Sequence, residues 1–168
     1  PVLTQVGDSW HRGRTGIAKE HLVTATVRSI LGSFLRLYAR TDAPARLLFA
    51  TPAGDRHEIG TIGAAMLAAS GGLGVTYLGR DLPATQIVES VTPAGAQVLV
   101  LGLTSSSRGK TSERGLREIV RDLPQDVELW AGGRGAARHA AIISPRGLVL
   151  DDYTAYQKEL VRIGGRVA

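Results

Sequence analysis

The chain has 168 residues and a formal net charge of +5. Of these residues 43% are hydrophobic, which is enough to form a sizeable buried core. No run of about 18 apolar residues is present, so we expect no transmembrane helix and no membrane partner, and the amino terminus lacks the layout of a secretory signal. Because cysteine is absent, disulfides, thiolate metal sites and a cysteine nucleophile are excluded, and we expect a cytoplasmic protein.

Residues 1–44 predict part of a helical bundle. Residues 15–40 predict a long amphipathic helix, because apolar side chains recur there at helical spacing. These side chains are Val23, Val27, Ile30, Leu31, Phe34 and Tyr38. Residues 1–10 predict the end of another helix, and the short break at residues 12–16 predicts an antiparallel hairpin. The two helices cannot cover each other's apolar faces, so we expect further helices upstream in a longer natural chain.

Residues 45–168 predict an α/β domain with a doubly wound five-stranded parallel sheet, which is a Rossmann-like fold. Short, nearly all-apolar runs alternate with helical patterns, as expected for strands that are covered on both faces. We expect the strands in flavodoxin-like order. The predicted strands are residues 46–51, 74–78, 97–102, 127–131 and 148–150, and the predicted helices are residues 57–70, 84–92, 110–122, 134–141 and 152–163.

Three arginines recur at helical spacing, namely Arg114, Arg117 and Arg121. A solvated helix face is the interpretation we favour, and a contact with DNA or with another subunit is the alternative. The other basic residues are scattered, and no helix-turn-helix, zinc-finger or RNA-binding signature is visible. We therefore expect that this chain alone does not read DNA. His139 lies within a predicted helix, and we expect it at the surface.

A histidine follows the first predicted strand of the α/β domain. The segment reads Asp55-Arg56-His57-Glu58-Ile59-Gly60. The imidazole is thus expected at the carboxyl end of the strand, where open α/β sheets bind ligands. Asp55 could hold one ring nitrogen, as carboxylates do for metal-bound histidines, and Gly60 would open a helix without a Cβ near the ligand. An ordinary surface histidine is the alternative.

Hydroxyl groups and glycines follow two other predicted strands. Thr104, Ser105 and Ser106 come after the third strand, and Gly132 and Gly133 come after the fourth. In a parallel sheet these residues lie at the same edge as His57. A groove lined by hydroxyl groups and by backbone without Cβ atoms would suit a long, flat ligand tail. For the glycine pair, a simple strand-to-helix turn is the alternative.

Because of the residues named in the two preceding paragraphs, the segment 45–168 resembles the cobalamin-binding domain of methionine synthase, corrinoid proteins and adenosylcobalamin mutases. The resemblance implies that His57 replaces the cofactor's own dimethylbenzimidazole as the lower axial cobalt ligand. This binding mode, in which the dimethylbenzimidazole base leaves the cobalt and a histidine takes its place, is called base-off/His-on. It also implies that the freed nucleotide tail lies beside Thr104 and the two glycines. The family's middle motif is usually Ser-x-Leu, and Thr104-Ser105-Ser106 keeps the hydroxyl but not the leucine.

A second group of residues lies in the predicted hairpin, where Trp10-His11 ends one helix and Glu20-His21 begins the next. Taken alone, a core tryptophan and two solvated first-turn residues explain this group. Together with the downstream motif, a Trp followed ten residues later by Glu-His resembles the cap of the CarH-type light-sensing repressors of the MerR family. In that cap, a helical bundle covers the upper face of the corrin.

The second resemblance implies a role for each residue of the cap. Trp10 would cover the 5′-deoxyadenosyl group of adenosylcobalamin, and Glu20 and His21 would contact it. After light breaks the cobalt–carbon bond, His11 would become the upper ligand, so that two histidines hold the cobalt. Which of His11 and His21 takes that position stays open. The bundle must shift to allow this change, and a two-state element of this kind suits a sensor.

We therefore expect a cobalamin-binding photoreceptor module of a light-responsive transcriptional regulator. It would form a homo-oligomer that changes with light, and it would reach DNA only through a DNA-binding domain absent from this chain. We expect no enzyme, because no catalytic base or nucleophile is apparent. The alternative function is a corrinoid methyl carrier or the small subunit of a mutase. A third hypothesis is a flavodoxin-like interaction module without a cofactor.

Overall fold

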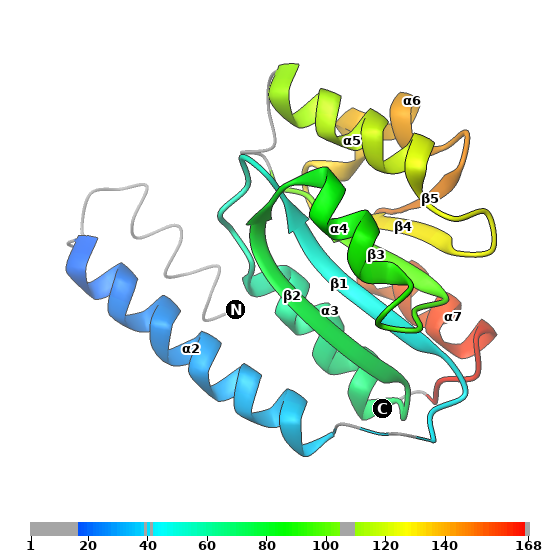
Figure 1. Cartoon of the computed structure of the whole chain (residues 1–168). Helices are drawn as coiled ribbons and strands as arrows, with labels where there is room; N and C mark the ends of the chain where they lie inside the picture. The colour runs from blue at the N-terminus through cyan, green and yellow to red at the C-terminus, as the bar shows by residue number, and fades with distance from the viewer. Residues whose placement is uncertain (1–16, 39, 41, 105–109, 167–168) are drawn as a thin grey trace.

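The computed structural model describes residues 17–38, 40, 42–104 and 110–166. They form a five-stranded, all-parallel sheet in the order β2-β1-β3-β4-β5, with helices on both faces (Figure 1). This is the flavodoxin-like order that the sequence predicted. The strands are β1 (Arg46–Pro52), β2 (Gly74–Leu82), β3 (Val98–Gly102), β4 (Glu128–Gly132) and β5 (Gly147–Leu150). The helices are α2 (Ile17–Leu37), α3 (Ile59–Ser70), α4 (Ala84–Val91), α5 (Lys110–Asp122), the 3₁₀ turn η1 (Ala136–His139), α6 (Ala140–Ile143) and α7 (Tyr153–Arg162).

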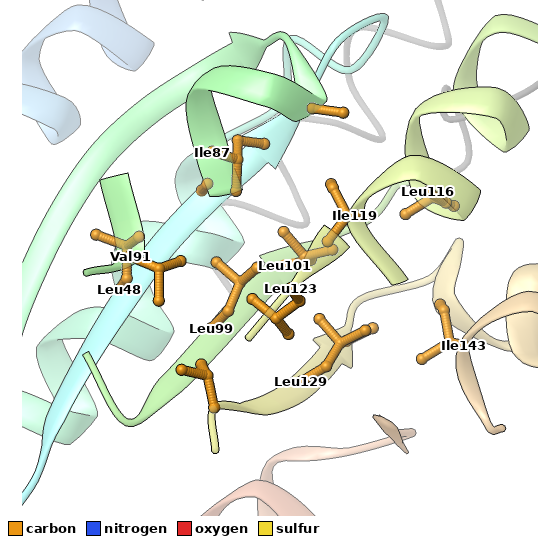
Figure 2. Close-up of a cluster of buried hydrophobic side chains, with 14 of the residues drawn as sticks. Leu48, Ile87, Val91, Leu99, Leu101, Leu116, Ile119, Leu123, Leu129 and Ile143 are labelled. Carbon is orange, nitrogen blue, oxygen red and sulfur yellow. The ribbon is translucent and has the colours of Figure 1, made fainter. Parts of the chain in front are cut away.

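The core consists of two apolar layers, one on each face of the sheet. On one face, the strands pack against α4, α5 and α6, and on the other face against α3 and α7. Figure 2 shows the first layer, in which the labelled side chains are Leu48, Ile87, Val91, Leu99, Leu101, Leu116, Ile119, Leu123, Leu129 and Ile143. Because successive residues of a strand point to opposite faces, β1 and β3 are apolar at nearly every position, as predicted for strands that are covered on both sides.

Helix α2 lies outside the sheet layers and packs against α3 (Figure 1). The structure confirms a long helix within the predicted range of residues 15–40, but this helix ends at Leu37, and the described residues Tyr38 and Arg40 lie outside it. Its predicted apolar face is divided, because Val23, Val27 and Leu31 are half-buried, whereas Ile30 and Phe34 are exposed. The predicted preceding helix lies outside the described residues.

Three predictions about the α/β part of the chain were wrong. The second strand does not stop at residue 78 but continues to Leu82, because irregular pairing with β1 extends as far as Pro52. The helix predicted over residues 134–141 is instead a 3₁₀ turn followed by the short α6. His139, which we expected at the surface, is buried with 3% of its surface exposed. It ends the η1 turn, which contacts β5, and so the fold covers the imidazole.

One other expectation agrees with the structure. Arg114, Arg117 and Arg121 lie on an exposed face of α5, which is the solvated helix face predicted for them. Among the described helices, none is both long and apolar enough to cross a membrane.

Candidate functional site

The candidate site lies at the carboxyl edge of the sheet, between the loops that follow β1 and β3. In the order 2-1-3-4-5, the chain leaves neighbouring strands β1 and β3 toward opposite faces, because α3 and α5 cover different sides. The sheet therefore has a topological switch point between β1 and β3, which is the usual ligand position in open α/β sheets. His57 lies in the loop between β1 and α3, and Thr104 follows β3. The structure thus places both residues at this switch point.

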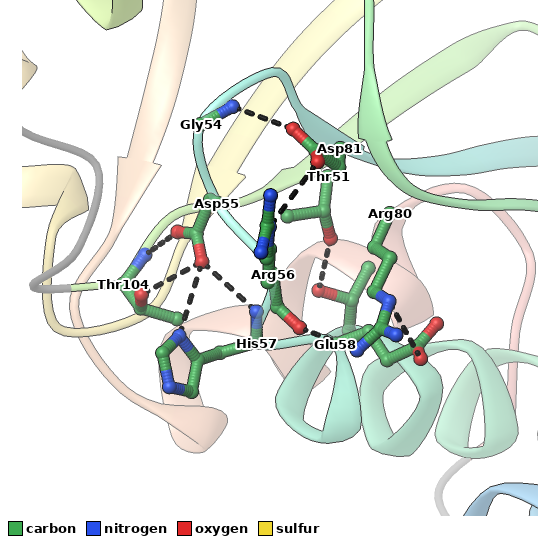
Figure 3. Close-up of polar contacts among 10 residues, drawn as sticks. Thr51, Gly54, Asp55, Arg56, His57, Glu58, Arg80, Asp81 and Thr104 are labelled. Carbon is green, nitrogen blue, oxygen red and sulfur yellow. Dashed lines mark hydrogen bonds and ion pairs between the residues drawn. The ribbon is translucent and has the colours of Figure 1, made fainter.

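Asp55 joins the two loops (Figure 3). Its side chain is 1% exposed, and its carboxylate accepts hydrogen bonds from both Thr104 and His57. The backbone N–H of Thr104 donates to Oδ2 at 2.6 Å, and the Thr104 hydroxyl and the backbone N–H of His57 donate to Oδ1 at 2.9 and 3.1 Å. Hydrogen bonds to a carboxylate are stronger than those between neutral groups, and Asp55 therefore fixes the loop after β1 against the loop after β3.

The imidazole of His57 is held on one side and exposed on the other. Its Nδ1 atom lies 3.5 Å from Oδ1 of Asp55, and its side chain is 65% exposed. Figure 3 shows the ring extending from the loop with Nδ1 toward Asp55, so that Nε2 is on the side away from the carboxylate. Metal-bound histidines have this arrangement, in which a carboxylate at one nitrogen orients the ring and makes the other nitrogen more basic.

The end of β2 holds the same loop from a third direction. Asp81 has a positive φ of 58°, a conformation in which Asp is enriched over most residues. Its Oδ1 accepts the backbone N–H of Gly54 at 2.8 Å, and its Oδ2 lies 3.5 Å from Nε of Arg56. The guanidinium of Arg80 donates to the carbonyl oxygen of Arg56 at 3.0 Å. The backbone on the amino-terminal side of the histidine is thus anchored to β2.

Glu58, on the other side of the histidine, is a buried carboxylate with partners from two elements. Its Oε1 lies 2.7 Å from Nε of Arg28 on α2 and 3.6 Å from Nε of Arg80 on β2. The hydroxyl of Tyr77 donates to Oε2 at 2.7 Å. Burial raises the pKa of Tyr77 above its usual range, and the hydrogen bond to Glu58 adds to this effect. The phenol therefore stays protonated and keeps donating to the carboxylate.

The two glycines after β4 have different surroundings. Gly133 has a φ of +97°, and a Cβ built on it would lie 2.4 Å from the carbonyl oxygen of Leu103. The loop after β4 therefore lies directly against the end of β3 and needs a glycine there. A Cβ on Gly132 would meet nothing closer than the Leu150 carbonyl oxygen at 3.7 Å. Of the two glycines, Gly132 is thus the one whose missing side chain leaves room.

This difference predicts the stability of two alanine variants. Gly133→Ala is expected to lower the free energy of unfolding by about 2–4 kcal/mol, because it combines backbone strain with overlap against Leu103. Gly132→Ala is the matched control, with an expected change below about 1 kcal/mol. Urea unfolding followed by circular dichroism measures both variants, and equal losses would contradict the assignment.

The structure brings some of the predicted site residues together. Asp55, His57 and Thr104 are in direct contact, and Arg56 and Glu58 flank the histidine. Ile59 and Gly60 open α3, and no atom lies within 4 Å of a Cβ built on Gly60.

The remaining predicted residues are placed only in part or not at all. Glu20 and His21 belong to the helical backbone of α2, and their side chains lie outside the described part of the structure. Trp10, His11, Ser105 and Ser106 also lie outside the described residues.

Sequence reasoning missed the residues that support the histidine loop from α2 and β2. Arg28, Tyr77, Arg80 and Asp81 lie 19 or more positions from their partners in this loop, and no motif connects them to it. Only Asp81 carried a local signal, because it follows the Gly79-Arg80 step directly after an apolar run. The predicted second strand ends at residue 78, directly before this step.

No family model matches the chain. It is 31% identical over 142 residues to the HTH-type transcriptional repressor CarH of Myxococcus xanthus, an alignment that covers 84% of this chain and 47% of CarH. It is 28% identical over 167 residues to the HTH-type transcriptional repressor CarA of the same organism, covering 99% of this chain and 55% of CarA. The chain thus spans about half the length of these two relatives.

Solved structures of cobalamin-binding and corrinoid proteins have a similar fold. A cobalamin-binding protein from Desulfitobacterium hafniense matches 95% of this chain and 76% of its own, with a TM-score of 0.56 and 22% identity. The monomethylamine corrinoid protein of Methanosarcina barkeri matches 95% of this chain and 77% of its own, with a TM-score of 0.64 and 15% identity. The methanol:cobalamin methyltransferase complex of the same organism matches 96% of this chain and 63% of its own, with a TM-score of 0.60 and 19% identity.

Proposed function

This chain is related in sequence to the CarH-type transcriptional repressors and has the fold of cobalamin-binding domains, and from this starting point we propose that it is the cobalamin-binding sensor module of a transcriptional regulator. His57 is the proposed lower axial ligand of the cobalt. The observation that carries the proposal is the position of this imidazole, with Nδ1 beside a buried carboxylate and the other nitrogen on the opposite side of the ring.

The donor groups at the site fit a metal that brings most of its own ligands. Among the described residues, no group of three or more His, Cys, Asp or Glu side chains could hold a metal ion, whereas a protein-bound zinc ion needs at least three protein ligands. A corrin ring would bring most of the cobalt's ligands with it, and His57 would supply one from the protein. A single oriented histidine at this edge of the sheet therefore suits a cobalamin better than a bare metal ion.

Each residue of the site has a proposed task. Asp55 accepts a hydrogen bond from the Nδ1–H group of His57 and so keeps Nε2 as the ligating atom. Thr104 holds Asp55 in place and, with Ser105 and Ser106, lines the path of the nucleotide tail. Gly132 leaves room for that tail beside β4.

We extend the proposal to light sensing by adenosylcobalamin, on the basis of the hairpin residues. In this proposal Trp10, Glu20 and His21 would hold the adenosyl group, and His11 would replace that group after light. When bound, the cofactor supplies the light-sensitive cobalt–carbon bond. The proposed output is a change in homo-oligomer formation, and DNA is reached through a part of the regulator outside this chain.

A corrinoid methyl carrier is the second candidate function. It is supported by the similar folds of the corrinoid and methyltransferase proteins named above. One fold serves many functions, and the sequence relationship instead connects this chain with repressors. A methyl carrier also has no need for the Trp10-His11 and Glu20-His21 pairs. We therefore place the sensor function first.

The experiment that tests the proposal is a visible absorption spectrum with adenosylcobalamin, taken in the dark and again after green light. A base-off, histidine-on spectrum in the dark is expected, followed by irreversible conversion to a form with two histidine ligands. Ordinary photolysis to aquocobalamin would favour the methyl carrier, and absence of binding would contradict both functions. The variants His11→Ala and His21→Ala identify the upper ligand, because only one of them should lose the light product.

A further inference from the structure

Glu58 occupies a junction between three elements of the fold. It is the residue directly before α3, and its side chain is only 5% exposed. Its carboxylate contacts Arg28 of α2 and Tyr77 and Arg80 of β2. A carboxylate is rarely buried unless charged or polar partners surround it, and here the partners come from outside its own loop.

The contact with Arg28 connects helix α2 to the rest of the fold. Among the ion pairs between described side chains, it alone joins α2 to the α/β part of the chain. The other polar side-chain contacts described for α2 stay within the helix, as in the hydrogen bond from Arg36 to the Ser33 hydroxyl at 3.0 Å. Helix α2 also packs against α3, and Leu35 of α2 packs against the neighbouring apolar core.

Glu58 is the residue that directly follows His57 in the chain. Arg80 reaches both neighbours of the histidine, because it donates to the carbonyl oxygen of Arg56 and faces Glu58. A shift of α2 that drew Arg28 away would leave a buried carboxylate with only its β2 partners. A buried carboxylate that loses a charged partner is destabilised, so the loop that carries Glu58 is expected to move or loosen together with α2.

We propose that Glu58 is a positioning residue that couples helix α2 to the loop of His57 through the ion pair between Arg28 and the buried Glu58 carboxylate. This inference rests on the proposed function in so far as His57 is taken as the cobalt ligand. The coupling itself is a property of the protein without cofactor. Through it, a displacement of α2 changes how firmly His57 is held for ligation.

The test begins with amide hydrogen exchange on the whole chain without cofactor. Arg28→Gln and Glu58→Gln remove the charge of one partner each while keeping a polar side chain. In both variants, the amides of α2 and of residues 53–58 are expected to exchange roughly 5- to 10-fold faster, and the double variant is expected to be no faster than the singles. Arg28→Lys keeps the cation and is expected to retain part of the protection.

The matched control is Arg36→Gln, because Arg36 lies on the same helix and bonds only within it. It is expected to leave the exchange of residues 53–58 unchanged. The proposal is overturned if Arg28→Gln also leaves those amides unchanged, or if the effects of the two single variants simply add. Either result means that the ion pair does not transmit a change from α2 to the loop.

A titration with hydroxocobalamin connects the coupling to the ligand. Arg28→Gln is expected to weaken histidine-ligated binding by roughly 5- to 10-fold, read from the visible spectrum, whereas Arg36→Gln is not. Equal affinities of Arg28→Gln and the unmodified protein would overturn the link to ligation. If the unmodified protein does not bind hydroxocobalamin, the proposed function fails, and the exchange experiment still decides whether Glu58 couples the two elements.

Discussion

Replacing His57 with alanine is expected to weaken cobalamin binding by at least about 100-fold. Loss of a residue that only orients a metal ligand weakens metal binding about 10- to 100-fold, and loss of the ligand itself should cost more. Stability should change little, since the imidazole is 65% exposed and exposed substitutions alter the free energy of unfolding by less than about 0.5 kcal/mol. A titration with methylcobalamin, followed in the visible spectrum, measures the first effect, and urea unfolding measures the second.

A rescue experiment separates ligation from other causes of weak binding. His57→Gly opens the position of the ring, and added imidazole is expected to restore the histidine-like absorption spectrum. Unchanged absorption in His57→Ala would show that this residue is not the axial ligand. Weak binding that imidazole does not repair would indicate that the loop, rather than the nitrogen, is responsible.

Asp55→Asn is expected to lower the free energy of unfolding by about 2–4 kcal/mol, although the two side chains have the same shape. Both carboxylate oxygens accept backbone N–H groups, one from Thr104 and one from His57. An amide has only one oxygen, so in either orientation one of these donors loses its acceptor, and the charge-assisted strength of the remaining bonds is lost as well.

Thermal unfolding measures this effect as a decrease in Tm of roughly 5–15 °C for a chain of this size. Cobalamin affinity is expected to fall 10- to 100-fold at a temperature where the variant is folded, because His57 loses the carboxylate that orients it. Asp42→Asn is the control, since Asp42 is 72% exposed and pairs with Arg40 at the surface; its Tm should stay close to that of the unmodified protein. Equal Tm values for Asp55→Asn and the control would show that the Asp55 hydrogen bonds do not stabilise the loop.

Much of the site could be predicted because its central motif is short and follows a strand. The apolar run of β1 placed His57 on a loop at the carboxyl edge of the sheet, and the spacing placed Asp55 close enough to reach it. The structure adds that Asp55 also holds Thr104, which lies 49 positions away. The sequence suggested only that the two residues share an edge, because a pattern of strands does not specify which side chains meet.

The support from α2 and β2 could not be predicted for the same reason. Arg28 and Glu58 are 30 positions apart and meet only because α2 packs along α3. Gly133 looked like a residue that makes room for a ligand, yet the carbonyl oxygen of Leu103 occupies that space. His139 looked exposed because its neighbours in sequence are polar or small, whereas the turn that contains it lies against β5.

The sequence by itself determined the alternation of strands and helices, the doubly wound parallel sheet and the position of His57 at the carboxyl end of the first strand. These features depend on local periodicity and on turns, which neighbouring residues specify. Only the tertiary structure decided that Asp55 joins two loops, that β2 anchors the backbone around the histidine, and that Glu58 connects this loop to α2. Such contacts join residues far apart in the chain, and they arise from the packing of whole elements, which no local pattern contains.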